Sequence, residues 1–219
     1  MKKEVAVYLE GGGDTAATIT PFRHGWSAFL KPVIDTARKS GVCWRVISCG
    51  GRQATYDAFC DALVNEPTVC NFMLVDSEEP VSTTVWEHLK NRVGDQWAKP
   101  LTAKEDRCHL MVVTMETWFL ADPEAVQQLY KHTKGFKGTA LMSLPALPNP
   151  PKSPTFLEGK SKAQVNEALH KAFAGTAHQG YEKIVHGAAI LGKIRAELVR
   201  RQCPCCDVFF KILEETIVG

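Results

Sequence analysis

Three carboxylates stand directly after short apolar runs of the chain, where they can act together on a metal ion. Glu10 follows the run EVAVYL, and Asp76 and Glu78 follow the run CNFMLV. Oxygen ligands from two elements suit Mg²⁺ or Mn²⁺, and such an ion relieves the repulsion between neighbouring carboxylates. An ion with open coordination positions activates water and stabilises a leaving oxygen, which is the chemistry of phosphoryl transfer and hydrolysis. These three residues therefore predict a Mg²⁺ (or Mn²⁺) site.

Two further acids are candidates for the same site. Asp14 lies beyond a turn of three glycines after Glu10, and either helps to hold a second ion or caps the next helix. Glu116 follows another apolar run, HLMVVT, so we expect it to act as a ligand or as a base beside the ligands. Asp122, directly before a proline, has the pattern of a helix cap.

Basic side chains near the predicted strand ends are candidates for phosphate contacts. Arg23 and Arg52 follow the ends of the first two strands; the alternative is that both are solvated surface arginines. Lys183 and His186 lie near one face of a later helical segment, together with Tyr181, where they can contact phosphate or donate a proton. A lone histidine on a helix is also commonly a packing or surface residue.

The glycine turn GGGD matches neither the dinucleotide-binding pattern G-x-G-x-x-G nor the phosphate-binding loop G-x-x-x-x-G-K-S/T. Dinucleotide binding is therefore not expected. A turn without side chains still allows a phosphodiester backbone to approach closely.

Four short apolar segments are predicted to be the strands that position these residues: 5–9, 44–48, 70–75 and 109–114. Helical patterns at 22–39, 53–64 and 84–93 separate them. In the first pattern we expect Pro21 in the first turn of the helix, and we expect Pro32 to kink the helix or split it in two. This alternation predicts an α/β fold with a mainly parallel, Rossmann-like sheet flanked by helices. In the flavodoxin-like order the first and third strands are neighbours, which brings Glu10 close to Asp76 and Glu78.

A proline-rich stretch, PALPNPPKSP at 145–154, is unsuited to a helix or a central strand. We place the boundary of an α/β domain, 1–150, in this stretch. The remaining residues, 151–219, are predicted to form a C-terminal helical extension packed on that domain, with helices at 162–173, 181–201 and 205–217.

Composition narrows the possible classes of function. The formal net charge is only +2, so contact with nucleic acid has to come from local basic patches. The chain has no apolar run of about 18 residues and no signal-peptide cleavage region, so we expect a cytoplasmic protein. The eight cysteines are expected to be reduced thiols; Cys203, Cys205 and Cys206 cluster but lack a second ligand pair at zinc spacing.

The segments YLEGGGD and LVDSE resemble the Toprim domain of topoisomerases, primases and overcoming-lysogenization-defect nucleases, which binds Mg²⁺ through an early Glu and a later Asp-x-Asp. More closely, CGGR with YDAFC, METWFLAD and YEKIVHGAAILGKI resemble the bacterial domain-of-unknown-function family 4276. That family is regarded as Toprim-like and is found partly beside ATPase genes in phage-defence neighbourhoods. The resemblance implies Glu10 as acid/base or ligand, and Asp76 and Glu78 as ligands. A Glu at position 78, where the wider fold often has Asp, leaves one-metal and two-metal chemistry open.

The residues and the resemblance together predict a Toprim-like, Mg²⁺-dependent nuclease that acts on DNA or RNA. The resemblance also implies that the protein is an effector of anti-phage defence with an ATPase partner. Self-association is a further expectation. A non-catalytic regulatory module that docks on an ATPase and uses the acids for structure is the alternative. A small-molecule phosphotransferase is a third hypothesis, because a fold alone does not fix an activity.

Overall fold

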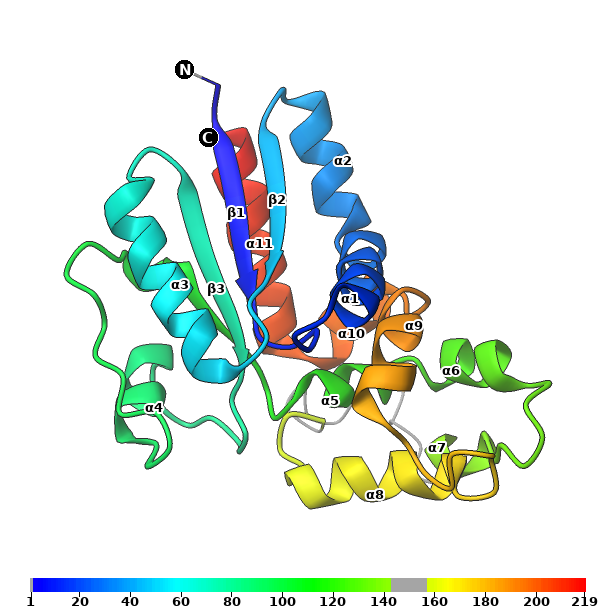
Figure 1. Ribbon diagram of the computed structural model, residues 1–219. Coiled ribbons are helices and arrows are strands. Elements are labelled where there is room, and N and C mark those ends of the chain that lie inside the picture. The colour runs from blue at the N-terminus through cyan, green and yellow to red at the C-terminus, as the bar shows by residue number, and fades with distance from the viewer. Residues whose placement is uncertain (1, 143–156) are drawn as a thin grey trace.

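The protein is described here from a computed structural model that covers residues 2–142 and 157–219. Its centre is one sheet of four parallel strands in the order β2-β1-β3-β4. The strands are β1 (Glu4–Leu9), β2 (Cys43–Ser48), β3 (Cys70–Asp76) and β4 (Cys108–Met111). The predicted α/β, Rossmann-like class is confirmed, and the first and third strands are neighbours as the flavodoxin-like order requires (Figure 1).

Helices connect and flank these strands in the described part of the chain. They are α1 (Ala16–Phe29), α2 (Lys31–Lys39), α3 (Arg52–Asn65), α4 (Val85–Asn91), η1 (Glu105–Arg107), α5 (Met115–Phe119), α6 (Pro123–Tyr130), α7 (Thr139–Met142), α8 (Lys162–Phe173), the π-helical turn η2 (Lys183–Gly187), α9 (Ala188–Leu191), α10 (Ala196–Gln202) and α11 (Pro204–Val218).

The alternation of apolar residues in β1 divides the interior into two cores, one on each face of the sheet. Val5 and Leu9 join a core that also contains side chains of α1, α2 and α11. Ala6 and Tyr8 point the other way and pack with residues of α3 and α4. Residues 5–9 of β1 are buried between the two cores and carry no charge, and the next charged side chain, Glu10, directly follows the strand.

The predicted helix 22–39 is two helices, α1 and α2, separated at Leu30 just before Pro32, so the predicted split is confirmed. The helix begins earlier than predicted, at Ala16, and Pro21 lies inside α1 instead of in its first turn. Residues 16–21 of α1 are not buried, and the buried face of the helix starts at Phe22. The pattern of apolar residues therefore gave no indication of the first turns of α1.

The predicted single helix 181–201 is wrong, because the chain forms the π-helical turn η2, which continues directly into α9, and then a separate helix, α10. Gly192 ends α9, and Arg195 then leaves the helical conformation with φ −86° and ψ 116°. There its backbone N–H and its guanidinium both donate to the buried carboxylate of Asp122, with N···O distances of 2.8 and 2.9 Å. A long-range contact thus overrides the local helical pattern. Asp122 caps α6, as predicted.

The predicted boundary at 145–154 lies outside the described residues, so the division into 1–150 and 151–219 stays a prediction. On both sides of that gap, side chains belong to the same apolar core: Phe29 of α1 and Phe210 of α11 meet with ring centroids 5.6 Å apart. Among the helices of residues 2–142 and 157–219, none combines the length with the apolar composition of a membrane-spanning segment.

Candidate metal centre

The ends of β1 and β3 bring three of the predicted acids to one place. Glu10 directly follows β1, Asp76 is the last residue of β3, and Glu78 comes two residues later. One carboxylate oxygen from each lies within 4.8 Å of the other two. The convergence follows from the parallel pairing of β1 with β3, since neighbouring parallel strands end at the same edge of the sheet.

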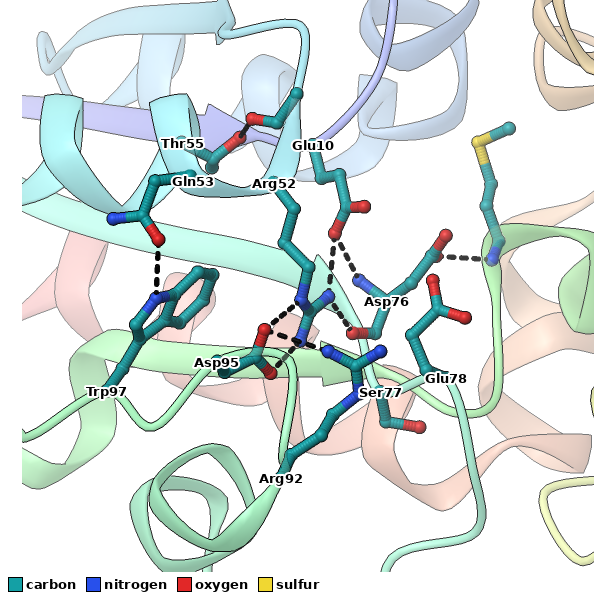
Figure 2. A network of polar contacts seen from close by, with 12 residues as sticks. Glu10, Arg52, Gln53, Thr55, Asp76, Ser77, Glu78, Arg92, Asp95 and Trp97 are labelled. Atoms are coloured by element: carbon teal, nitrogen blue, oxygen red, sulfur yellow. Dashed lines mark hydrogen bonds and ion pairs between the residues drawn. The ribbon is translucent and has the colours of Figure 1, made fainter.

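The main chain fixes the directions of these side chains. The backbone N–H of Asp76 donates to Glu10 Oε2 at 3.1 Å, so the carboxylate of Glu10 is bound to the last backbone N–H of β3 (Figure 2). Glu78 has φ +68°, an uncommon conformation for a residue with a side chain, and its N–H donates to the carbonyl of Val113 at 2.7 Å. This hydrogen bond holds the strained turn that brings Glu78 back toward Asp76.

The glycine turn after Glu10 has no room for side chains. Gly11 and Gly12 have φ +113° and +94°, values that favour glycine. A Cβ on Gly12 would lie 2.2 Å from Ser48 Oγ and 2.9 Å from the ring of Phe22. The turn therefore needs glycine both for its backbone conformation and for its close packing on α1.

Arg52, the first residue of α3, binds Glu10 but is also held by other groups. Its Nη1 donates to Glu10 Oε2 at 2.9 Å and to the carbonyl of Asp76, while Nε and Nη2 each reach the buried carboxylate of Asp95 at 2.6 Å (Figure 2). Asp95 also binds Arg92 at 2.9 Å, and the guanidinium of Arg52 lies 5.1 Å from the ring centroid of Trp97. With all three nitrogens engaged, Arg52 orients Glu10 and is poorly placed to hold phosphate as well.

Lys183 completes the centre from the C-terminal part of the chain. Its Nζ lies 3.0 Å from Asp76 Oδ2 and 3.8 Å from Glu116 Oε2, while the other oxygen of Asp76 accepts from the N–H of Met115 at 2.8 Å. Glu116 is 4% exposed and accepts a hydrogen bond from the hydroxyl of Tyr181 at 3.0 Å. Glu116 thus lies beside the acid cluster and is joined to it by the lysine.

Burial and neighbouring charges shift the protonation of this group. Burial raises the pKa of Asp76, the carboxylates of Glu10 and Glu116 add to that effect, and Lys183 opposes it. Burial alone would lower the pKa of Lys183, but Asp76 and Glu116 outweigh it and raise the pKa, so the amine stays charged. Burial, reinforced by Glu116, raises the pKa of Tyr181 well above its usual range, so the phenol keeps its proton.

The other predicted site residues lie elsewhere. Asp14 is exposed and outside the cluster of three acids; the cap of α1 is Thr15, so the capping role proposed for Asp14 belongs to its neighbour. Arg23 is exposed on α1. His186 is 4% exposed and packs between aromatic rings, with its centroid 4.4 Å from that of Phe173, so it has the packing role that sequence reasoning gave as the alternative.

Sequence reasoning missed two charged residues of the centre. Asp95 anchors Arg52, and the amine of Lys162, at the start of α8, pairs with Glu78 Oε2. Asp95 stands in a polar loop with no periodic pattern, and Lys162 is 84 residues from its partner, so no local signal marks either one.

The geometry fits a divalent cation. The three converging groups are all hard oxygen donors, the type of ligand that Mg²⁺ and Mn²⁺ prefer. Arg52 and the N–H of Asp76 bind Oε2 of Glu10, and Lys162 pairs with Oε2 of Glu78. Among the described residues, these contacts leave Oε1 of Glu10 and Oε1 of Glu78 to serve as ligands.

The chain was compared with protein families, curated proteins and solved structures. A family model described as "Domain of unknown function (DUF4276)" matches residues 9–214. Neither the curated proteins nor the solved structures contain a match.

Proposed function

Because the chain belongs to the family described as domain of unknown function 4276, whose description states no activity, we propose a function from the chemistry of its site: Mg²⁺- or Mn²⁺-dependent hydrolysis of phosphodiester bonds in nucleic acid. The observation that carries the proposal is the convergence of Glu10, Asp76 and Glu78 within 4.8 Å at the carboxyl edge of a parallel sheet. Open α/β sheets bind their ligands at that edge.

The residues of the centre have distinct roles in this proposal. Glu10, Asp76 and Glu78 would hold the cation, which when bound would polarise the phosphate and lower the pKa of a bound water. The ammonium of Lys183 lies beside Asp76 and would stabilise the negative charge that develops on the phosphoryl oxygens. Glu116, bound by the hydroxyl of Tyr181, holds that lysine from the opposite side.

The biological setting is a further part of the proposal, supported by the resemblance of YLEGGGD and LVDSE to Toprim segments. We propose a Toprim-like nuclease that acts in the cytoplasm as an effector of anti-phage defence together with an ATPase. The modest net charge of +2 supports the need for a partner, because the chain by itself has little means of collecting polyanions.

The test is to incubate the purified protein with plasmid, single-stranded DNA and tRNA in the presence of Mg²⁺, Mn²⁺ or EDTA. We expect cleavage that depends on the metal and is lost in Asp76→Asn. The matched control is Asp57→Asn, an exposed carboxylate on α3, which should cleave like the wild type. Metal-independent cleavage, or equal loss in both variants, would contradict the proposal.

A second candidate is a non-catalytic module that docks on an ATPase. The observation that favours it is that Arg52, Lys162 and Lys183 already pair with the acids, so the cluster is partly neutralised without an ion. The two candidates differ in their response to metal. A ligand that binds the folded state raises the melting temperature. We therefore expect Mn²⁺ to stabilise the wild type and not Asp76→Asn, whereas a structural cluster would show no such difference.

A further inference from the structure

A small cavity adjoins the acid cluster and is not used by the metal chemistry proposed above. It has a volume of about 210 Å³ and lies between the glycine turn, α1 and the segment that carries Lys183. Its lining includes Glu10 and Lys183, so its contents would lie next to the groups that would act on phosphate. We call this hollow the glycine-turn cavity.

The walls of the glycine-turn cavity are largely apolar. Phe22, Ile184 and Ala188 supply side chains, and the glycines of the turn, on which the ring of Phe22 packs, complete the lining. Ile184 is 65% exposed, although large apolar side chains are usually buried. The cavity is smaller than the roughly 300–1,000 Å³ of sites for drug-sized ligands, so it suits one flat ring system and not a dinucleotide.

A second hollow, of about 360 Å³, shares Lys183 with the first; because polar residues line it, we call it the polar hollow. Lys162, Asn166 and His170 line it, together with Glu116 and Tyr181. Lys183 lines both hollows, and Lys162 also pairs with Glu78 of the acid cluster. The two hollows and the acid cluster therefore adjoin one another at Lys183 and Lys162, and this surface has a largely apolar hollow on one part and cationic and hydrogen-bonding groups on the other.

We infer that this surface binds single-stranded nucleic acid, with one unstacked base in the glycine-turn cavity and the adjoining sugar–phosphate backbone along the polar hollow. This inference rests on the proposed function and names its substrate class. The apolar face of the base would contact Phe22 and Ile184. The phosphate of the same nucleotide would then lie near Lys183 and near the cation that Glu10 is proposed to hold. A base within a duplex is stacked and paired and reaches such a cavity only after it is pulled out of the helix, so single strands are preferred.

The test measures binding in Ca²⁺, so that its result does not depend on cleavage. A fluorescently labelled oligothymidylate is compared with a strand of the same length that carries abasic sites throughout, and with a duplex of the same length; the corresponding RNA strand distinguishes RNA from DNA. We expect the strand with bases to bind about tenfold more tightly than the abasic strand, the order expected for burying one base. The duplex should bind like the abasic strand.

Two neighbouring variants show where the base binds. Ile184→Ser removes an apolar side chain from the cavity and should abolish the preference for bases, while its affinity for the abasic strand stays that of the wild type. Val185→Ser is the matched control, because Val185 is 46% exposed and does not line the cavity. It should keep the full preference.

Equal affinity for the abasic strand and the strand with bases, tighter binding of the duplex, or an equal effect of both variants would overturn the inference. So would the absence of binding to any strand. Metal-dependent cleavage with no preference for bases would leave the proposed function intact and remove only this inference. A preference for bases without any cleavage in Mg²⁺ or Mn²⁺ would do the reverse.

Discussion

Individual carboxylates in this protein differ in what surrounds them, and the surroundings decide their roles. Asp122 is as buried as Asp76, yet it receives three hydrogen bonds from Arg195, and these, against the opposing effect of burial, hold its pKa below the usual range. It is a structural acid that caps a helix. The carboxylate of Asp76 has one amine and one backbone N–H, and neighbouring acids oppose its ionisation. The surroundings of Asp76 therefore fit the metal-binding role that we propose for it, and those of Asp122 do not.

Glu158 provides a test of pH dependence outside the cluster of Glu10, Asp76 and Glu78. Burial raises the pKa of Glu158 from its ordinary value of 4.5 to about 7, opposed in part by the N–H of Cys205, which donates to Oε1 at 2.9 Å. The folded state therefore holds this proton more tightly than the unfolded state. The resulting penalty is absent below pH 4.5, grows as the pH rises, and is complete above about pH 7.

Glu158→Gln should remove that penalty and keep the acceptor for Cys205. We expect the variant to gain on the order of 2 kcal/mol in free energy of unfolding at pH 8 and almost nothing at pH 4, measured by urea denaturation. Glu215→Gln, at an exposed position on α11, is the control and should show no such pH dependence. A gain of the same size at both pH values would show that packing, and not ionisation, is responsible.

At the scale of elements, the packing of α1 against α9 positions Lys183. Gly25 lies where the two helices meet, and a Cβ at this position would be 2.5 Å from the carbonyl oxygen of Ala188. Because η2 continues directly into α9, a displacement of α9 also moves the lysine away from Asp76.

Gly25→Ala should therefore lower both stability and metal affinity. We expect a loss of about 1–3 kcal/mol in free energy of unfolding, the usual cost of inserting an atom into a packed contact. The measurements are urea denaturation and a Mn²⁺ titration by calorimetry. Gly51→Ser is the control, since a Cβ there meets nothing within 4 Å and serine is a favourable residue at the start of a helix. If Gly25→Ala had the stability of the wild type, the contact between α1 and α9 would be shown to accommodate the added methyl group.

At the scale of the whole molecule, the C-terminal helix α11 belongs to the same core as the sheet. Phe209 and Phe210 are completely buried, and Phe209 packs on His109 of β4 with ring centroids 5.0 Å apart. A fragment ending at residue 155 would expose this apolar surface. We expect it to be insoluble or to lack a cooperative thermal transition, as measured by circular dichroism. A soluble fragment with a sharp transition would show that the α/β part folds independently.

The overall charge leads to a prediction about salt. The net charge of +2 and the few cations beside the acids allow only a small number of phosphate contacts. Affinity of the isolated protein for a single strand should be weak, and its logarithm should fall with the logarithm of salt concentration with a slope of about −2. Fluorescence anisotropy at several salt concentrations measures it, with size-exclusion chromatography to detect self-association. Tight binding at physiological salt without a partner would contradict this expectation.

The sequence by itself indicated the four strands and the three acids at the ends of the first and third, whereas the adjacency of these two strands was expected only if the sheet had the flavodoxin-like order. Short apolar runs indicate buried parallel strands, and after the first and third runs the next charged residues, Glu10 and Asp76, lie at the edge of the sheet. The breaks in 181–201 were not predicted, because a hydrogen-bonding partner 73 residues away, Asp122, set the conformation of Arg195.

Only the tertiary structure decided which basic groups join the centre. Lys183 reaches Asp76 across 107 residues of chain, and Arg52 is oriented by Asp95 across 43. From the sequence, Arg23 and His186 were candidates for phosphate contacts just as Arg52 and Lys183 were. In the structure, Arg23 is exposed on α1 and His186 packs among aromatic rings. The physical reason is that nothing in the sequence around a charged residue indicates which distant residue will pair with it. Its partner is set by how helices pack on the sheet, and that packing depends on close contacts such as Gly25 against Ala188.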